Sequence, residues 1–259
     1  MLESIRELWK FRALIGALVT RHLAMRYRGS ALGFLWSFLN PLCLMVVYTI
    51  VFQYYIRFNT VENYTIFLFC GLLPWIWVTS GLLESTTSIV SSGHLITKSM
   101  FPAQILPLVA VITTMVNFLL SLPLLALFMY LAHLPFHASL LLLPLCIGLQ
   151  ALLLFGLGLL LSAVNVQFRD VQHILGNFLT LLFFLCPVVY PASTVPQAFR
   201  FTLDINPFAG LLMMYHSLIL DGVVPGLQSW VYITAWTGAA LVVGNLVYNR
   251  FRDGFAELL

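Results

Sequence analysis

Charged residues are scarce in this 259-residue sequence. Asp, Glu, Lys and Arg together make up 8% of it, whereas 61% of its residues are hydrophobic. A soluble domain has about 25% charged residues, so the composition excludes a protein surrounded mainly by water. Each helical crossing of a bilayer needs about 20 largely apolar residues, and the chain contains several apolar stretches of that kind. We therefore expect a polytopic membrane protein.

The apolar stretches predict an all-α fold with six transmembrane helices. The expected spans are residues 34–56, 65–83, 105–131, 140–164, 174–190 and 228–248. The polar residues 84–104 are expected to form a connector outside the lipid. The whole chain, 1–259, is interpreted as one transmembrane domain, with its membrane region at 34–248 and a cytoplasmic tail at 249–259.

Two further segments have distinct patterns. Residues 1–33 repeat apolar and basic side chains at helical spacing, which is typical of an amphipathic helix that lies in the membrane interface. Residues 191–227 mix prolines with apolar runs that are too short for a crossing. This second pattern predicts short re-entrant helices before the last span.

Lysine and arginine are distributed unevenly between the expected connections. With the N-terminus in the cytoplasm, ten of the twelve Lys and Arg residues lie on the cytoplasmic side, and only Arg57 and Arg200 lie outside. Cytoplasmic loops of membrane proteins carry such an excess. The basic residues are therefore interpreted as topology signals rather than as a nucleic-acid surface, and both termini are expected in the cytoplasm.

The expected spans also lack formal charges, because all nine acidic residues fall in connections or tails. This absence argues against a carboxylate proton relay within the membrane. No Gly-rich loop followed by Lys and Ser or Thr is present, and the cytoplasmic segments are too short for a nucleotide-binding domain. We expect ATP and Mg²⁺ to bind to a separate ATPase, with no cofactor in this chain.

Cysteine and histidine offer no metal-binding pattern. The four cysteines, Cys43, Cys70, Cys146 and Cys186, lie far apart in apolar stretches and are interpreted as buried thiols. His133 and His137 have i, i+4 spacing, but a proline separates them and no third ligand is near in sequence. Neither a metal site nor a catalytic residue is predicted.

Short motifs in a fixed order resemble the type-2 ABC exporter permeases of the O-antigen, capsule and teichoic-acid group, with O-antigen permeases nearest. The motifs are Arg26–Trp36, Asn40–Leu42, Gly71–Trp75, Phe168–Asp170, Cys186–Tyr190 and Asn206–Phe208. The resemblance implies a homodimer in the bacterial inner membrane, joined to two copies of an ATPase. It also implies a passage for a glycan on undecaprenyl diphosphate, and contacts with the ATPase from residues 1–30 and 84–104.

Within this interpretation, aromatic side chains are candidates for the wall of the substrate channel, since aromatic faces support sugar rings without demanding one hydrogen-bond pattern. These candidates are Tyr48, Phe52, Tyr54, Tyr55, Trp75 and Trp77. An interfacial belt or helix packing is the alternative, and it is favoured for any single one of them.

The remaining candidates are charged residues and prolines. Arg21, Arg26 and Arg28 are expected either to attract the lipid diphosphate or to hold the helix on an anionic leaflet. The candidates for an outer gate are Pro191, Pro196, Asn206, Pro207 and Phe208. The candidates for ATPase contact are Glu84, His94, Lys98, Arg169 and Asp170. For Arg169 and Asp170 the main expectation is that they cap the cytoplasmic end of a helix and fix the loop through charge pairing and helix-dipole interactions; a gate or an ATPase contact is their alternative role.

Two other functions remain open from the sequence. An ABC permease for drugs or other lipids would share the fold, because nothing in the sequence defines the substrate pocket. A membrane-embedded enzyme that modifies glycans or lipids would have to use the outer-loop carboxylates of Glu62, Asp204 and Asp221.

Overall fold

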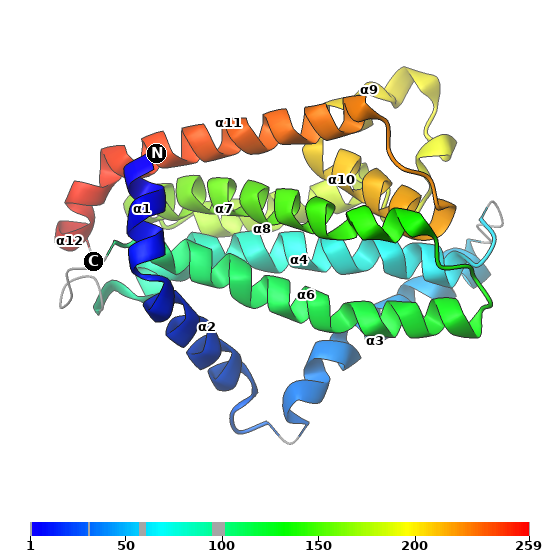
Figure 1. The fold of residues 1–259 in the computed structure, drawn as a ribbon, viewed down its shortest axis with the longest axis horizontal. Helices are drawn as coiled ribbons and strands as arrows, with labels where there is room; N and C mark the ends of the chain where they lie inside the picture. Colours follow the sequence, from blue (N-terminus) through cyan, green and yellow to red (C-terminus); the bar gives the residue numbers. More distant parts are fainter. Residues whose placement is uncertain (1, 31, 57–60, 95–101, 259) are drawn as a thin grey trace.

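Six antiparallel passes of helix form the body of the molecule (Figure 1). The computed structural model describes residues 2–30, 32–56, 61–94 and 102–258, and these contain helices but no strand. The passes are α3 (Trp36–Thr49, continued by a π-helical turn at Ile50–Tyr55), α4 (Tyr64–Ser91), α6 (Ile105–Leu131), α7 (Leu143–Gln167), α8 (Val171–Leu185) and α11 (Leu227–Phe251). Both termini lie at the same end of the bundle, as an even number of passes requires.

Five of these passes are long and apolar enough to cross a membrane. The pass formed by α8 is apolar but only 15 residues long, which is less than the approximately 20 residues of a full crossing. Pro187 follows α8 closely, and proline cannot donate the backbone hydrogen bond that would continue a helix. The expected span at 174–190 is therefore shorter than predicted and begins earlier.

The helix α4 corrects another expectation. It continues to Ser91, so residues 84–91 belong to a helix of membrane-spanning length rather than to the polar connector. The hydroxyl groups of this stretch bond to their own helix: Thr86 Oγ1 donates to the Leu82 carbonyl at 2.7 Å, and Ser88 Oγ donates to the Ser85 carbonyl at 2.7 Å. Glu84 thus lies on the same helix as the expected span, directly after its last residue, Leu83.

The N-terminal segment forms two helices instead of one, α1 (Leu2–Lys10) and α2 (Arg12–Tyr27). Leu18 of α2 packs against Ile105 and Val109 at the start of α6. An irregular stretch that contains Gly29, with a φ of +80°, then leads into α3. Figure 1 shows that α2 and α3 diverge from the bundle toward this stretch.

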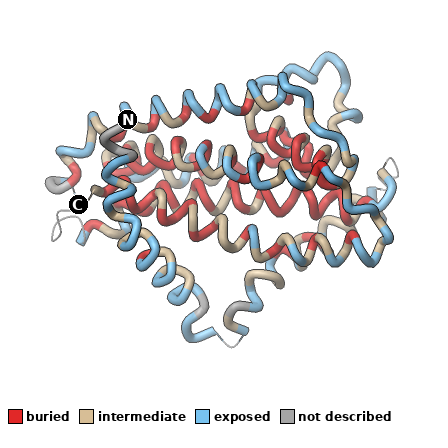
Figure 2. The backbone as a smooth tube through the Cα atoms, viewed as in Figure 1, coloured by how far each residue is buried: buried red, intermediate tan, exposed pale blue. Residues whose placement is uncertain are grey.

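The core is centred on α4. In its most apolar 18-residue stretch 78% of the residues are buried, against 17% in the corresponding stretches of α3 and α11. Figure 2 shows the buried backbone concentrated in the central helices. Small residues permit the closest helix contact, where Gly156 of α7 lies against the backbone at Ala240 of α11, and Gly244 lies against Gly156. Close backbone approach at small residues is a general device of membrane helices.

Between α8 and α11 the chain forms the expected series of short helices. After short 3₁₀ turns at Ala192–Thr194 and Gln197–Phe199, α9 (Phe201–Ile205) and α10 (Pro207–His216, continued by a π turn at Ser217–Asp221) meet at an angle of 98°. They lie at the end of the bundle opposite to the termini (Figure 1). After α11, a 3₁₀ turn (Arg252–Gly254) and α12 (Phe255–Leu258) form the C-terminal tail.

Candidate functional site

An aromatic cluster joins α3, α4, α8 and α10. The Tyr48 ring stacks on Phe183 with ring centroids 5.5 Å apart, and Phe52 meets Tyr48 edge-on at 6.3 Å. Trp75 lies 5.9 Å from Phe183 and 6.4 Å from Phe208. Three of the six channel candidates thus meet in one place, together with the gate candidate Phe208.

The other three channel candidates lie elsewhere. Tyr54 and Tyr55 are 66% and 76% exposed at the end of the π turn that follows α3. Trp77 is buried within the subunit, where its indole stacks on Phe118 of α6 with centroids 5.0 Å apart. These positions place the tyrosines on the surface and Trp77 in the core.

A polar cleft of about 680 Å³ opens between α3, α4 and α6. Its uncharged polar lining comes from all three helices: Ser37, Asn40, Thr79, Ser80, Thr114, Asn117 and Ser121. Arg26 and Ser30 line the end next to α2, and Trp36, Trp77 and Phe118 contribute aromatic wall. A cleft of this composition differs from the rest of the apolar bundle.

A second, nearly apolar groove of about 640 Å³ lies between α7, α8, α11 and the short helices. Leu157, Phe178, Phe201 and Trp236 are among its lining residues. The polar cleft and this groove offer two different environments to a ligand at membrane depth.

Two of the three arginine candidates are free of ion pairs within the described residues. Arg26 is the exception, because its Nη1 donates to Glu84 Oε1 at 3.0 Å and so ties α2 to α4. Arg21 and Arg28 are exposed. Partial burial, and then the charge of Arg21, lower the pKa of His22.

Four of the five ATPase-contact candidates lie within the described residues. His94, Arg169 and Asp170 are exposed, and Lys98 lies outside the described residues. The charge pairing expected of Arg169 and Asp170 is not seen among the described residues, where neither side chain forms an ion pair. Asp170 does precede α8 as its N-cap, but it contributes its backbone carbonyl and not its carboxylate.

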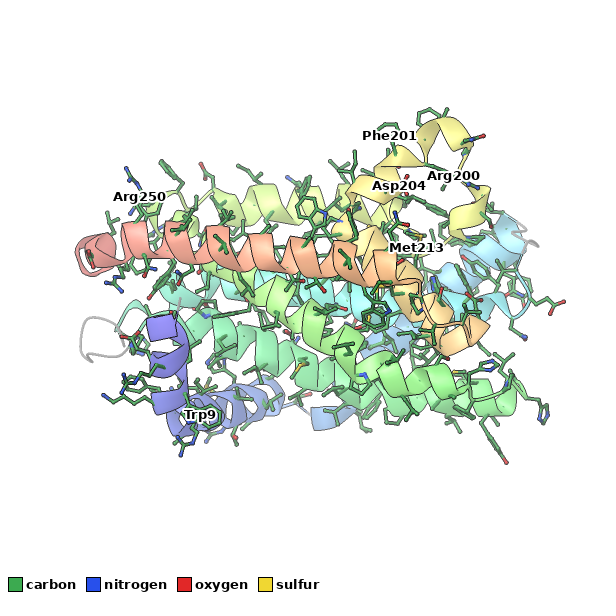
Figure 3. The ribbon with its side chains drawn as sticks, turned by 45° about the horizontal axis from the view of Figure 1, so that its top comes forward. Trp9, Arg200, Phe201, Asp204, Met213 and Arg250 are labelled. Carbon is green, nitrogen blue, oxygen red and sulfur yellow. The ribbon has the colours of Figure 1, made fainter. Side chains whose placement is uncertain are left out.

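Most gate candidates have structural contacts. Asn206 Oδ1 accepts from the Phe208 N–H at 3.0 Å, and Asn206 Nδ2 donates to Cys186 Sγ at 3.1 Å. Phe208 is buried, Pro191 and Pro207 are partly buried, and Pro196 is exposed. The outermost part of this region instead presents Arg200, Phe201 and Asp204 (Figure 3).

Metal binding receives no support from the structure. Across the described ranges, no three His, Cys, Asp or Glu side chains are grouped so that they could hold a metal ion. Cys70, Cys146 and Cys186 are buried free thiols, as expected, whereas Cys43 is exposed.

Comparison with known proteins identifies the family. Residues 13–220 match the family model of the ABC-2 type transporter. The chain belongs to the ABC-2 transporter family. An O-antigen export system permease protein RfbA from Myxococcus xanthus is 40% identical over 261 residues, which cover 99% of each chain.

More distant relatives show the same coverage of nearly the whole chain. An O-antigen export system permease protein RfbA from Klebsiella pneumoniae is 30% identical over 95% of each chain. The polysialic acid transport protein KpsM from Escherichia coli is 23% identical and covers 92% of this chain and 93% of its own. This ABC-2 protein is therefore a multi-pass membrane transport subunit rather than an enzyme, and ABC-2 permeases work with ABC ATPase partners.

Sequence reasoning missed several residues that organise this ABC-2 permease. Phe183 joins Tyr48 to Trp75, although its spacing in an apolar run gave no sign of a special role. His216 is buried: its ring stacks on Phe67 with ring centroids 4.3 Å apart, and its Nε2 lies 3.2 Å from the Phe67 carbonyl oxygen. The signal that could have indicated this burial is that His216 stands among apolar residues at a helical position.

Proposed function

We propose that this chain is the membrane subunit of an exporter for lipid-linked polysaccharide, with O-antigen as its cargo. The observation that carries the proposal is the 40% identity, over 99% of both chains, to an O-antigen export system permease. The relatives named for capsule-type polymers are more distant, at 23% identity. O-antigen is therefore favoured over capsule polysaccharide, drugs or other lipids.

The proposed working unit is a homodimer with two ATPase subunits. Two features of the single subunit support a second copy: α3 and α8 both expose large apolar side chains, including Val46, Val47, Phe178 and Leu181. The aromatic cluster at Tyr48 and Phe183 lies where these two helices meet. A passage between two such faces would have aromatic and uncharged walls, which suit a neutral sugar chain.

The proposed orientation places both termini in the cytoplasm of a bacterium and the short helices α9 and α10 at the outer face of the inner membrane. Figure 3 supports it, since Trp9 and Arg250 lie at one end of the bundle and Arg200, Phe201 and Asp204 at the other. The excess of Lys and Arg at the first end agrees with the positive-inside rule.

The proposed carrier is undecaprenyl diphosphate, which would approach from the cytoplasmic leaflet. The exposed guanidinium groups of Arg21 and Arg28 support this, because arginine forks match phosphate oxygens. Arg26 contributes less to diphosphate binding in this conformation, since its charge is matched by Glu84 at 3.0 Å.

The test is to co-purify the chain with candidate ATPases and to measure ATP hydrolysis with and without lipid-linked glycan. We expect a stable complex whose hydrolysis rises with the O-antigen lipid and stays unchanged with the same lipid lacking sugar. Stimulation by drugs or phospholipids instead would favour the alternative exporter. Turnover of glycan by the purified chain alone would contradict the proposal altogether.

A further inference from the structure

The polar cleft between α3, α4 and α6 is lined by residues of a single chain. Its volume of about 680 Å³ falls in the range of small-molecule sites, about 300–1,000 Å³. Polar side chains at membrane depth are costly unless they have partners or a function. The hydrogen-bonding groups of the cleft define what it could hold.

Hydroxyl groups on two of the helices can accept hydrogen bonds from a ligand but cannot donate. On α4, Thr79 Oγ1 and Ser80 Oγ donate to the Ile76 carbonyl at 3.0 and 2.7 Å. On α6, Thr114 Oγ1 donates to the Ala110 carbonyl at 2.9 Å, and Ser121 Oγ donates to the Asn117 carbonyl at 3.0 Å. Because a hydroxyl has one hydrogen and two lone pairs, the ligand has to supply several donors.

The charge of the cleft narrows the ligand class further. Arg26 is the one charged residue in its lining as the structure describes it, and that charge is matched by Glu84 at 3.0 Å. An ionic headgroup would therefore find no uncompensated charge. Phosphate oxygens only accept hydrogen bonds and a quaternary ammonium group donates none, so neither suits the hydroxyl-rich wall.

One donor in the cleft wall has no partner. The Trp77 indole nitrogen is buried and makes no hydrogen bond within the described part of the chain. The neighbouring ring atom Cδ1 lies beside Gly81, as does Thr114 Oγ1. A buried, unpaired N–H costs free energy, and this polar group lies in a residue that contributes to the cleft wall.

We propose that this cleft binds a sugar ring of a membrane-borne glycoside within each subunit. A sugar presents many hydroxyl donors to the Thr and Ser oxygens and carries no charge. Its C–H faces can pack on aromatic wall such as Trp36 and Phe118. Both the exported glycan and a membrane glycolipid carry such a ring, and only the first source rests on the proposed function.

The test uses the full chain in phosphatidylcholine nanodiscs and an octyl β-glucoside that carries a photoreactive diazirine next to the sugar. We expect saturable labelling of residues 36–44, 73–83 and 114–121, mapped by mass spectrometry. Unmodified octyl glucoside should compete, whereas octyl phosphocholine, which has the same tail and no donor, should not. Equal competition by both, labelling elsewhere, or no saturable labelling would overturn the proposal.

Matched variants locate the binding groups. Thr79→Val should weaken labelling about fivefold, the value of one net hydrogen bond. Thr180→Val is the control, because Thr180 Oγ1 makes the same kind of bond, to the Gly176 carbonyl at 3.0 Å, on α8 outside the cleft. Ser80→Ala serves as a second, smaller change in case Thr79→Val does not fold. Unchanged labelling in both cleft variants would refute the assignment.

The source of the sugar is distinguished by two further competitors, a polyprenyl-diphosphate glycan and a monoglucosyl diacylglycerol. Competition by the first alone assigns the cleft to the exported cargo, and competition by the second assigns it to a membrane lipid. The assay requires neither ATP nor transport. A negative result would leave the exporter proposal intact, and a failed ATPase stimulation would leave this binding result intact.

Discussion

The contact between α7 and α11 allows a quantitative prediction for Gly156→Ala. A Cβ atom at Gly156 would lie 2.6 Å from the backbone carbon of Ala240, whereas ordinary contacts begin at 3.4 Å. The two helices would have to separate by about 0.8 Å (3.4 − 2.6), and neither backbone can yield as a flexible side chain would. Overpacking of this kind costs about 1–3 kcal/mol.

Gly148→Ala is the matched control on the same helix, because a Cβ there would meet nothing within 4 Å. Both substitutions gain the same helix propensity, up to about 1 kcal/mol, so the difference between the variants isolates the contact. We expect Gly156→Ala to be less stable than Gly148→Ala by about 1–3 kcal/mol. The measurement is unfolding in mixed micelles with increasing dodecyl sulfate. Equal unfolding midpoints would refute the close approach of α7 and α11.

Three further predictions concern contacts between segments distant in sequence. Glu84→Arg should weaken the contact between α2 and α4 by about 0.5 kcal/mol, because the ion pair is half-exposed, and should reduce export. The contact is measured by crosslinking cysteines introduced into α2 and α4. Adding Arg26→Glu should restore both crosslinking and export, and a double variant no better than the single one would count against the pair. Phe183→Ala should destabilise the aromatic cluster by about 3–5 kcal/mol in the same unfolding assay, whereas Phe178→Ala, on the exposed face of α8, should cost much less; similar losses would contradict the packing. Asn206→Ala should cost about 1 kcal/mol through the lost cap of α10, and Asn177→Ala should leave stability nearly unchanged; the reverse order would exclude the capping role.

The sequence predicted helices best where polarity changes abruptly. The third span was expected at 105–131 and is found at Ile105–Leu131, since polar residues precede it and it is uncharged and mostly apolar over its length. The second span was predicted to end too early, because Ser and Thr residues were taken as signs of a connection. In the structure these hydroxyls bond to preceding carbonyls of their own helix, as Thr86 does.

The candidate site was predictable only in part, because it depends on contacts between distant segments. Aromatic residues of α4 were identified, but the sequence could not show that Trp75 faces Phe183 while Trp77 faces Phe118. Their two-residue separation turns them about 200° apart on a helix. Likewise, Arg26 and Glu84 are 58 residues apart, so no local pattern could indicate their ion pair.

The enclosure of α4 has a consequence for how substitutions would be tolerated over generations. In the most apolar stretch of α4, 78% of the residues are buried by neighbouring parts of the protein. This stretch therefore has little contact with acyl chains and need not be uniformly apolar. Hydroxyl groups such as those of Thr79 and Ser80 can persist there, while any change of shape disturbs several neighbours at once. In the peripheral α11 only 17% of the most apolar stretch is buried. We expect α11 to tolerate apolar side chains of many shapes, because they face fluid lipid, but few polar side chains.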